Sequence, residues 1–105
     1  MKSRDVPRPP VGLGPPERKF WGEIVGVWKL DEQALEILRT ACWAKFRERE
    51  ARARLECDGA VVTDRFGQQK VHPSVLIERD AQGIFLRSMQ ALKLDVEGPA
   101  GRSPR

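Results

Sequence analysis

The fold of this chain is decided between Asp58 and Ala81, where the sequence reads DGAVVTDRFGQQKVHPSVLIERDA. Two short runs that contain valine, residues 60–62 and 70–71, are separated by mostly polar residues that include Gly67. Short β-prone runs around a glycine-containing turn predict a β-hairpin. His72 and Pro73 follow. Proline is typical of the first turn of a helix, because it needs no partner for an amide hydrogen there and its backbone angle is preset. The stretch therefore predicts a hairpin that leads directly into a helix.

Helical periodicity flanks the predicted hairpin on both sides. Before it, apolar residues recur every three or four positions over about 31–56, and after it they do so over about 73–94. Asp31 is of the residue type that caps a helix N-terminus with its side-chain oxygen. A shorter amphipathic helix is predicted over about 15–27. We therefore predict a mainly α fold, with three helices and a β-hairpin between the second and the third.

The apolar stripe of the second predicted helix is strong only in its first half, where its members are Leu35, Leu38, Cys42 and Phe46. Beyond it, Arg49 falls close to the same line. The pairs Glu48 with Arg52 and Glu50 with Arg54 are spaced four apart, which stabilises a helix by only about 0.2–0.5 kcal/mol per pair. We therefore expect the end of this helix to project beyond the core of the monomer. The third predicted helix has one apolar core face, formed by Ile77, Ala81, Ile84, Phe85, Ser88 and Leu92.

The two ends of the chain differ in composition from its middle. Residues 1–14 and 95–105 combine proline, glycine and basic side chains. Such segments bury too little apolar surface to offset the entropy lost on ordering. We therefore expect a flexible basic arm over 1–14, one small helical domain over 15–94 and a flexible tail over 95–105.

Size and charge indicate the kind of partner. A chain of 105 residues has a small core, and small domains are often stabilised by a partner subunit, so a homo-oligomer is expected. The 19 Lys and Arg residues exceed the 15 Asp and Glu residues, which weakly favours a polyanionic partner. No apolar run approaches the roughly 20 residues that span a membrane. We expect a cytosolic protein without a membrane contact.

No catalytic constellation can be assembled from the sequence. His72 is the sole histidine, and together with Cys42 and Cys57 it falls short of the three or four ligands of a zinc site. Its position before Pro73 is better explained by entry into the helix. The run GLGPP at 12–16 has prolines where a phosphate-binding loop needs backbone amides. We predict no catalytic, metal or cofactor-binding residues, and hence a protein that is not an enzyme.

Two sets of residues are candidates for contact surfaces. On a helical wheel Trp43 projects away from the apolar stripe, among charged residues, and tryptophan is over-represented in interface hot spots. Packing of Trp43 under the first helix or the hairpin is the alternative. The candidate oligomer contacts are Trp21, Trp28 and Trp43. For DNA, the useful basic side chains are those without an acidic partner, because they neutralise phosphates; the candidates are Lys45, Arg47, Arg49, Arg65 and Lys70.

The order of these features over about 15–97 resembles the small subunit of tailed-phage terminases, in the branch called the P27 family. The first part of the match comprises Pro15, Pro16, Trp28, Leu30, Asp31 and Gly59. The second part comprises Lys70, His72, Pro73, Glu78, Ala81, Leu86, Arg87, Leu92 and Leu94. Each element is a common helix or turn signal, and the resemblance lies in their order and spacing.

The resemblance implies a ring-forming protein without a catalytic centre. Such a protein would bind double-stranded DNA where packaging starts and regulate the large subunit, which carries the ATPase and the nuclease. It would act in the cytoplasm of a bacterial host as the product of a phage or prophage. Two other classes stay open: a phage transcriptional regulator or excisionase-like DNA binder, and a structural adaptor or toxin–antitoxin partner. The hairpin between the second and third helices disfavours a helix-turn-helix regulator.

Overall fold

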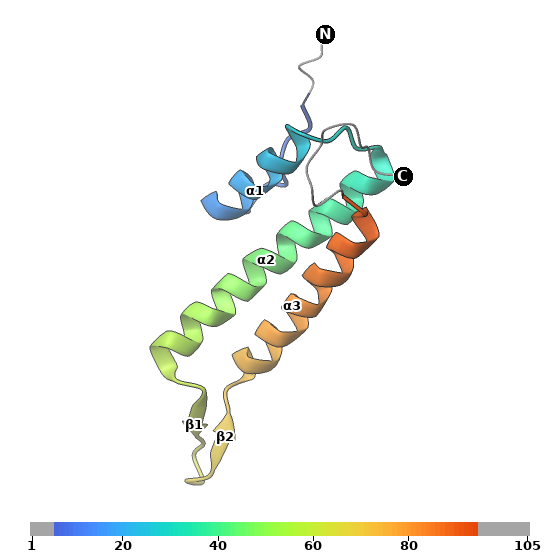
Figure 1. Ribbon diagram of the computed structural model, residues 1–105. Helices are drawn as coiled ribbons and strands as arrows, with labels where there is room; N and C mark the ends of the chain where they lie inside the picture. The colour runs from blue at the N-terminus through green and yellow to red at the C-terminus, as the bar shows by residue number, and fades with distance from the viewer. Residues whose placement is uncertain (1–5, 95–105) are drawn as a thin grey trace.

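The computed structural model describes residues 6–94, and residues 1–5 and 95–105 lie outside its described part. In order along the chain, its elements are α1 (Pro15–Val25), α2 (Glu32–Asp58), β1 (Val61–Thr63), β2 (Gln69–Val71) and α3 (Pro73–Leu92). The predicted mainly α fold with a hairpin between the second and third helices is confirmed. Figure 1 shows α2 and α3 side by side as a long helical hairpin, with α1 against it and the β-hairpin beyond its far end.

Local signals start and end the helices as the sequence predicts. The Asp31 carboxylate accepts a hydrogen bond from the amide of Ala34 at 2.8 Å and caps α2. His72 caps α3: its Nδ1 accepts from the amide of Ser74 at 2.9 Å, and Pro73 occupies the first turn. The helix-entry role of His72 is thus confirmed. Gly59 ends α2 at a φ of 85°, a conformation that favours glycine.

The hydrophobic core lies at the end of the molecule where α1 crosses the helical hairpin. It comprises Leu13, Trp21, Ile24, Leu35, Leu38, Cys42 and Leu92. The predicted stripe of α2 therefore faces this core. Burial raises the pKa of the Cys42 thiol to about 11, whereas Cys57 is exposed.

The packed region begins earlier than the predicted domain boundary at residue 15. Leu13 is only 3% exposed, and the indole N–H of Trp21 donates to the carbonyl oxygen of Pro7 at 2.8 Å. Residues 6–14, which we assigned to a flexible arm, are held in this way against α1. One large apolar side chain, Leu13, is enough to place this part of the segment in the core. The rest of the predicted arm and the predicted tail lie outside the described residues.

The second half of α2 does not project beyond the core, contrary to our expectation. Ala44, Ala51 and Leu55 are buried, and α3 runs alongside. Arg52 donates to Glu78 at 2.8 Å and Gln82 donates to Glu48 at 3.0 Å, so polar side chains also bridge the two helices. The buried residues of α3 are Ser74, Ala81, Ser88 and Leu92. The first three are spaced by seven, as in a coiled-coil seam, and their small side chains allow close packing without large apolar residues.

The β-hairpin pairs Val61 with Val71, Val62 with Lys70 and Thr63 with Gln69. Its turn contains Gly67, at a φ of 81°. The described molecule is elongated, with extents of 61 × 23 × 21 Å, and the hairpin forms one of its ends (Figure 1). Val61 and Val71 are 56% and 60% exposed, so the helices do not cover this sheet face.

Candidate nucleic-acid interface and contact surfaces

The five basic residues predicted to contact DNA do not form one surface. Arg65 and Lys70 lie on the β-hairpin, whereas Lys45, Arg47 and Arg49 lie on α2. The three α2 residues have different surroundings. Arg47 lines a hollow between α2 and α3, while the other two make contacts within the subunit.

Arg49 binds a buried carboxylate. Its Nε and Nη2 donate to the two carboxylate oxygens of Glu17 at 2.9 and 2.8 Å, and Glu17 is 1% exposed. The hydrogen bond from Arg49 holds the pKa of Glu17 below its ordinary value, although burial opposes this shift. Gly14 leaves room for the pair, because a Cβ there would collide with Arg49 Nη2. The pair fastens α1 to the middle of α2. The premise that Arg49 has no acidic partner is therefore wrong.

Lys45 also acts within the subunit. Its Nζ lies 5.1 Å from the ring centroid of Phe20 on α1 and 5.2 Å from that of Phe85 on α3. The two rings are themselves 5.7 Å apart. A cation near two aromatic rings is favourable, so Lys45 helps to join all three helices.

The tip of the β-hairpin is organised around Asp64. Its Oδ1 accepts hydrogen bonds from the amides of Phe66 and Gln68, both at 2.9 Å, and its Oδ2 lies 3.4 Å from Lys70 Nζ. The Gln68 amide, with further contributions from Phe66 and Lys70, keeps the pKa of Asp64 below its ordinary value. Lys70 therefore has an acidic neighbour, contrary to the premise of its selection, although its side chain remains 62% exposed. Arg65 has its guanidinium carbon 5.1 Å from the ring centroid of Phe66.

A furrow runs between α2 and α3. Its main hollow, of about 670 Å³, is lined by Glu36, Arg39, Thr40, Trp43, Ala44, Arg47, Ile77, Asp80, Ala81 and Ile84. A second hollow of about 170 Å³ shares Arg47 and Ile77 with it, and a third of about 240 Å³ shares Thr40 and Ile84. We call these three hollows together the α2–α3 furrow. No residue of α1 lines any of them.

The α2–α3 furrow has an apolar floor and a charged rim. Ile84, predicted on the core face of the third helix, is 37% exposed and lines two of the hollows. This correction arises because no residue of α1 lines these hollows, so the side of α3 that carries Ile84 stays open. Arg39 on the rim is paired with Glu36 at 2.7 Å.

The three tryptophans differ in their availability for contacts. Trp21 is 1% exposed within the core, so its prediction as a subunit contact is wrong. Trp43 is 37% exposed and lines the α2–α3 furrow; it packs edge-on against Phe46, and Gly12 lies close to its ring. Both of these neighbours lie outside the first helix and the hairpin. The segment before α1 covers it on one side, and its remaining surface faces the furrow.

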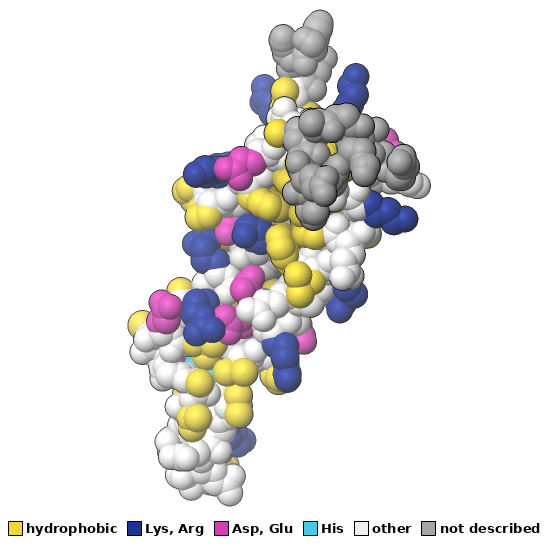
Figure 2. Space-filling view, viewed as in Figure 1, with side chains coloured by type: hydrophobic (Ala, Val, Ile, Leu, Met, Phe, Trp, Pro, Cys, Tyr) yellow, Lys and Arg dark blue, Asp and Glu magenta, His cyan; other side chains and the backbone are white. Residues whose placement is uncertain are grey.

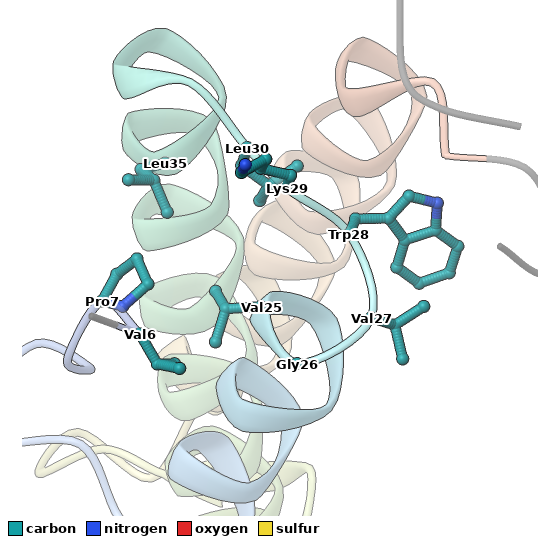
Figure 3. A pocket seen from close by; sticks show the side chains of 9 residues that line it. All are labelled: Val6, Pro7, Val25, Gly26, Val27, Trp28, Lys29, Leu30 and Leu35. Atoms are coloured by element: carbon teal, nitrogen blue, oxygen red, sulfur yellow. The ribbon is translucent and has the colours of Figure 1, made fainter. Parts of the chain in front are cut away.

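Trp28 lines a separate hollow of about 440 Å³ next to the turn between α1 and α2. Figure 3 shows Val6 and Pro7 on one side of this hollow and Val27 and Trp28 on the other. Lys29 is the one charged residue among those that line it. The lining therefore brings no set of acidic, histidine or cysteine side chains together for chemistry.

The comparisons with known proteins identify no relative: no family model, no curated protein and no solved structure matches the chain. Within residues 6–94, no three His, Cys, Asp or Glu side chains are grouped to hold a metal ion. The same residues contain no helix long and apolar enough to cross a membrane.

Two important features had no signal in the sequence. The partner of Arg49 is Glu17, which is 32 positions away, so no helical spacing relates them. The α2–α3 furrow is open because α1 packs on the opposite side of the α2–α3 helical hairpin. Only Trp43, as a large aromatic residue off the apolar stripe, pointed towards it.

Proposed function

We propose that this chain is the small, non-catalytic subunit of a phage DNA-packaging terminase. In this role it assembles with copies of itself, binds double-stranded DNA and regulates the large subunit, which carries the ATPase and the nuclease. The proposal combines the resemblance of the sequence with two structural features that support it: the open α2–α3 furrow and the basic tip of the β-hairpin.

The observation that carries the proposal is the α2–α3 furrow. α1 covers one face of the seam between α2 and α3, whereas the other face exposes Trp43 and Ile84. Burial of apolar surface at about 25 cal/mol per Å² is the main driving force of association. A helix from a neighbouring copy is the partner that fits a groove between two helices. Charges of both signs on the rim, among them Arg47 and Asp80, suit a contact between copies.

The assembly can be tested with a matched pair of substitutions on α3. Ile84→Glu places a charge in the furrow, whereas Leu86→Glu places one at a residue that is 60% exposed and lines none of the three hollows. Native mass spectrometry of the wild type should give a mass of many subunits, and Ile84→Glu should shift it to smaller species. Leu86→Glu should leave the mass unchanged, and circular dichroism should show both variants folded.

Two results would contradict the proposal. A wild-type monomer would remove the ring altogether, and a wild-type dimer would favour the transcriptional regulator. If Ile84→Glu assembles like the wild type, the furrow is not the contact between copies.

A further inference from the structure

The β-hairpin presents an aromatic and a basic side chain together at its tip. Phe66 is 76% exposed, which makes it the most exposed aromatic side chain of residues 6–94. The guanidinium carbon of Arg65 lies 5.1 Å from its ring centroid. Neither side chain belongs to the helical core. Their position is therefore not explained by the packing of this subunit.

The backbone that carries these side chains is firmly organised. Asp64 accepts from the amides of Phe66 and Gln68, and the Asp64 amide donates to the carbonyl oxygen of Gln68 at 2.8 Å. The Gly67 amide donates to the carbonyl oxygen of Asp64 at 3.0 Å. Side-chain to backbone bonds of this kind fix a turn locally. The tip is thus preorganised, which lowers the entropy lost when it binds.

The hairpin also has the reach to enter a groove. Each strand has three residues, and at about 3.3 Å per residue they carry the turn about 10 Å beyond the helices. The minor groove of B-DNA is about 7.5 Å deep. Figure 1 shows that no helix flanks the tip, so the helices do not obstruct its approach.

The charge of the hairpin is complementary to DNA. Residues 60–71 contain two basic residues, Arg65 and Lys70, and one acidic residue, Asp64. The Asp64 side chain is only 19% exposed and faces amide hydrogens and Lys70, whereas Lys70 is 62% exposed. On the face seen in Figure 2, the hairpin shows hydrophobic and uncharged surface, a basic side chain at one edge and no acidic side chain.

We infer that the hairpin tip inserts into the minor groove of double-stranded DNA. Arg65 enters the groove, Phe66 wedges against a base step and Lys70 lies near a phosphate. Arginine together with an inserted apolar side chain is the combination that minor-groove proteins use to bind and kink DNA. This inference rests on the proposed DNA-binding function and assigns it to one element of the fold.

The experiment uses the full chain and a short DNA duplex with a central run of A·T pairs that carries 2-aminopurine, whose fluorescence rises when its base step is unstacked. Wild-type protein should raise the fluorescence. Phe66→Ala should abolish the rise and weaken binding by about 10-fold, the size of a lost base–aromatic contact. Arg65→Ala should weaken binding by about 10-fold, the size of a lost groove contact, and Lys70→Ala should lower the slope of log affinity against log salt by about 0.9. A minor-groove ligand such as netropsin should displace the protein.

Matched controls lie on α3. Leu86→Ala removes an exposed apolar side chain, and Arg79→Ala removes an exposed arginine; both should behave as the wild type. Equal effects in tip and control variants would overturn the inference, as would a failure of netropsin to compete.

The outcomes separate this inference from the proposed function. If the wild type binds no duplex under any salt condition, the DNA-binding part of the proposed function fails and the inference fails with it. If the wild type binds but Phe66→Ala and Arg65→Ala bind equally well, only the inference is overturned. A changed oligomer mass in Phe66→Ala, with DNA binding intact, would make the tip a contact between copies.

Discussion

The Glu17–Arg49 pair shows how a residue with an apparently free charge can be a structural element. Arg49 lies on the same side of α2 as the core stripe, and its guanidinium meets a carboxylate that is 1% exposed. Burial of a carboxylate without a partner is costly. The effect of breaking the pair therefore depends on which of the two side chains is removed. Glu17 would remain buried without its guanidinium, whereas Arg49 is exposed enough to be hydrated.

This asymmetry gives the first prediction at the scale of residues. Arg49→Met should lower the free energy of unfolding by about 2 kcal/mol at neutral pH, because the Glu17 carboxylate stays buried without a counter-charge. Glu17→Gln should cost less, because it leaves no buried charge. Urea unfolding followed by circular dichroism measures both.

The pH dependence has a definite sign. In the wild type the Glu17 pKa is lowered, so the stability from the pair is present above the ordinary glutamate pKa of about 4.3 and is lost as the pH falls through the folded-state value. In Arg49→Met the contributions of Arg49 that lower this pKa are lost, while burial still raises it, so the Glu17 pKa lies higher than in the wild type and acid relieves the buried charge sooner. The difference between the two proteins should therefore shrink as the pH falls from 7 towards 4. A constant difference would contradict this account.

At the scale of elements, the packing of α2 on α3 depends on small residues. Ala81 and Ala44 are 2% and 3% exposed, and both line the α2–α3 furrow. Small side chains let two helices approach closely. The buried small residues of α3, Ser74, Ala81 and Ser88, are spaced by seven and so form a continuous seam against α2, which a search for large apolar residues does not detect.

Enlarging one of these residues tests the seam. Ala81→Leu should lower the free energy of unfolding by about 1–3 kcal/mol, because the added side chain must push the helices apart. The control is Ala53→Leu on the exposed side of α2, which should stay within about 0.5 kcal/mol of the wild type. Thermal unfolding of both variants gives the answer, and equal stabilities would show that the seam has room to spare.

At the scale of the whole molecule, the elongated shape separates the surfaces. The hairpin tip lies at one end of a 61 Å body, and the core that contains α1 lies towards the other (Figure 1). Of the basic residues considered for DNA, Arg65 and Lys70 share the first end, whereas Lys45 and Arg49 hold α1 in place. The five basic residues therefore do not lie on a single surface that could bind DNA.

Salt dependence separates the two groups of basic residues. Lys70→Ala should lower the log–log salt slope of DNA binding by about 0.9, the value for one phosphate contact. Lys45→Met should leave the slope unchanged and instead lower thermal stability, because its ammonium lies over Phe20 and Phe85. Titrations at several salt concentrations measure the slopes. A reduced slope in Lys45→Met would contradict this account and indicate that α2 contacts DNA.

The sequence by itself determined the elements and their order. The caps at Asp31 and His72, the proline at the start of α3 and the turn at Gly67 all act within a few residues of themselves. Their physical effects are local, namely hydrogen bonds to nearby amides and restricted backbone angles, and a single sequence expresses them fully. The long stripe of α2 was equally clear because large apolar side chains define it.

Only the tertiary structure decided which residues of different elements contact one another. It paired Arg49 with Glu17, placed Leu13 in the core, covered Trp21 and left Trp43 and Ile84 along an open furrow. These outcomes depend on contacts between residues far apart in sequence and on the side from which α1 approaches. Charge, burial and exposure are properties of that arrangement, because a side chain's free energy depends on which neighbours replace its water.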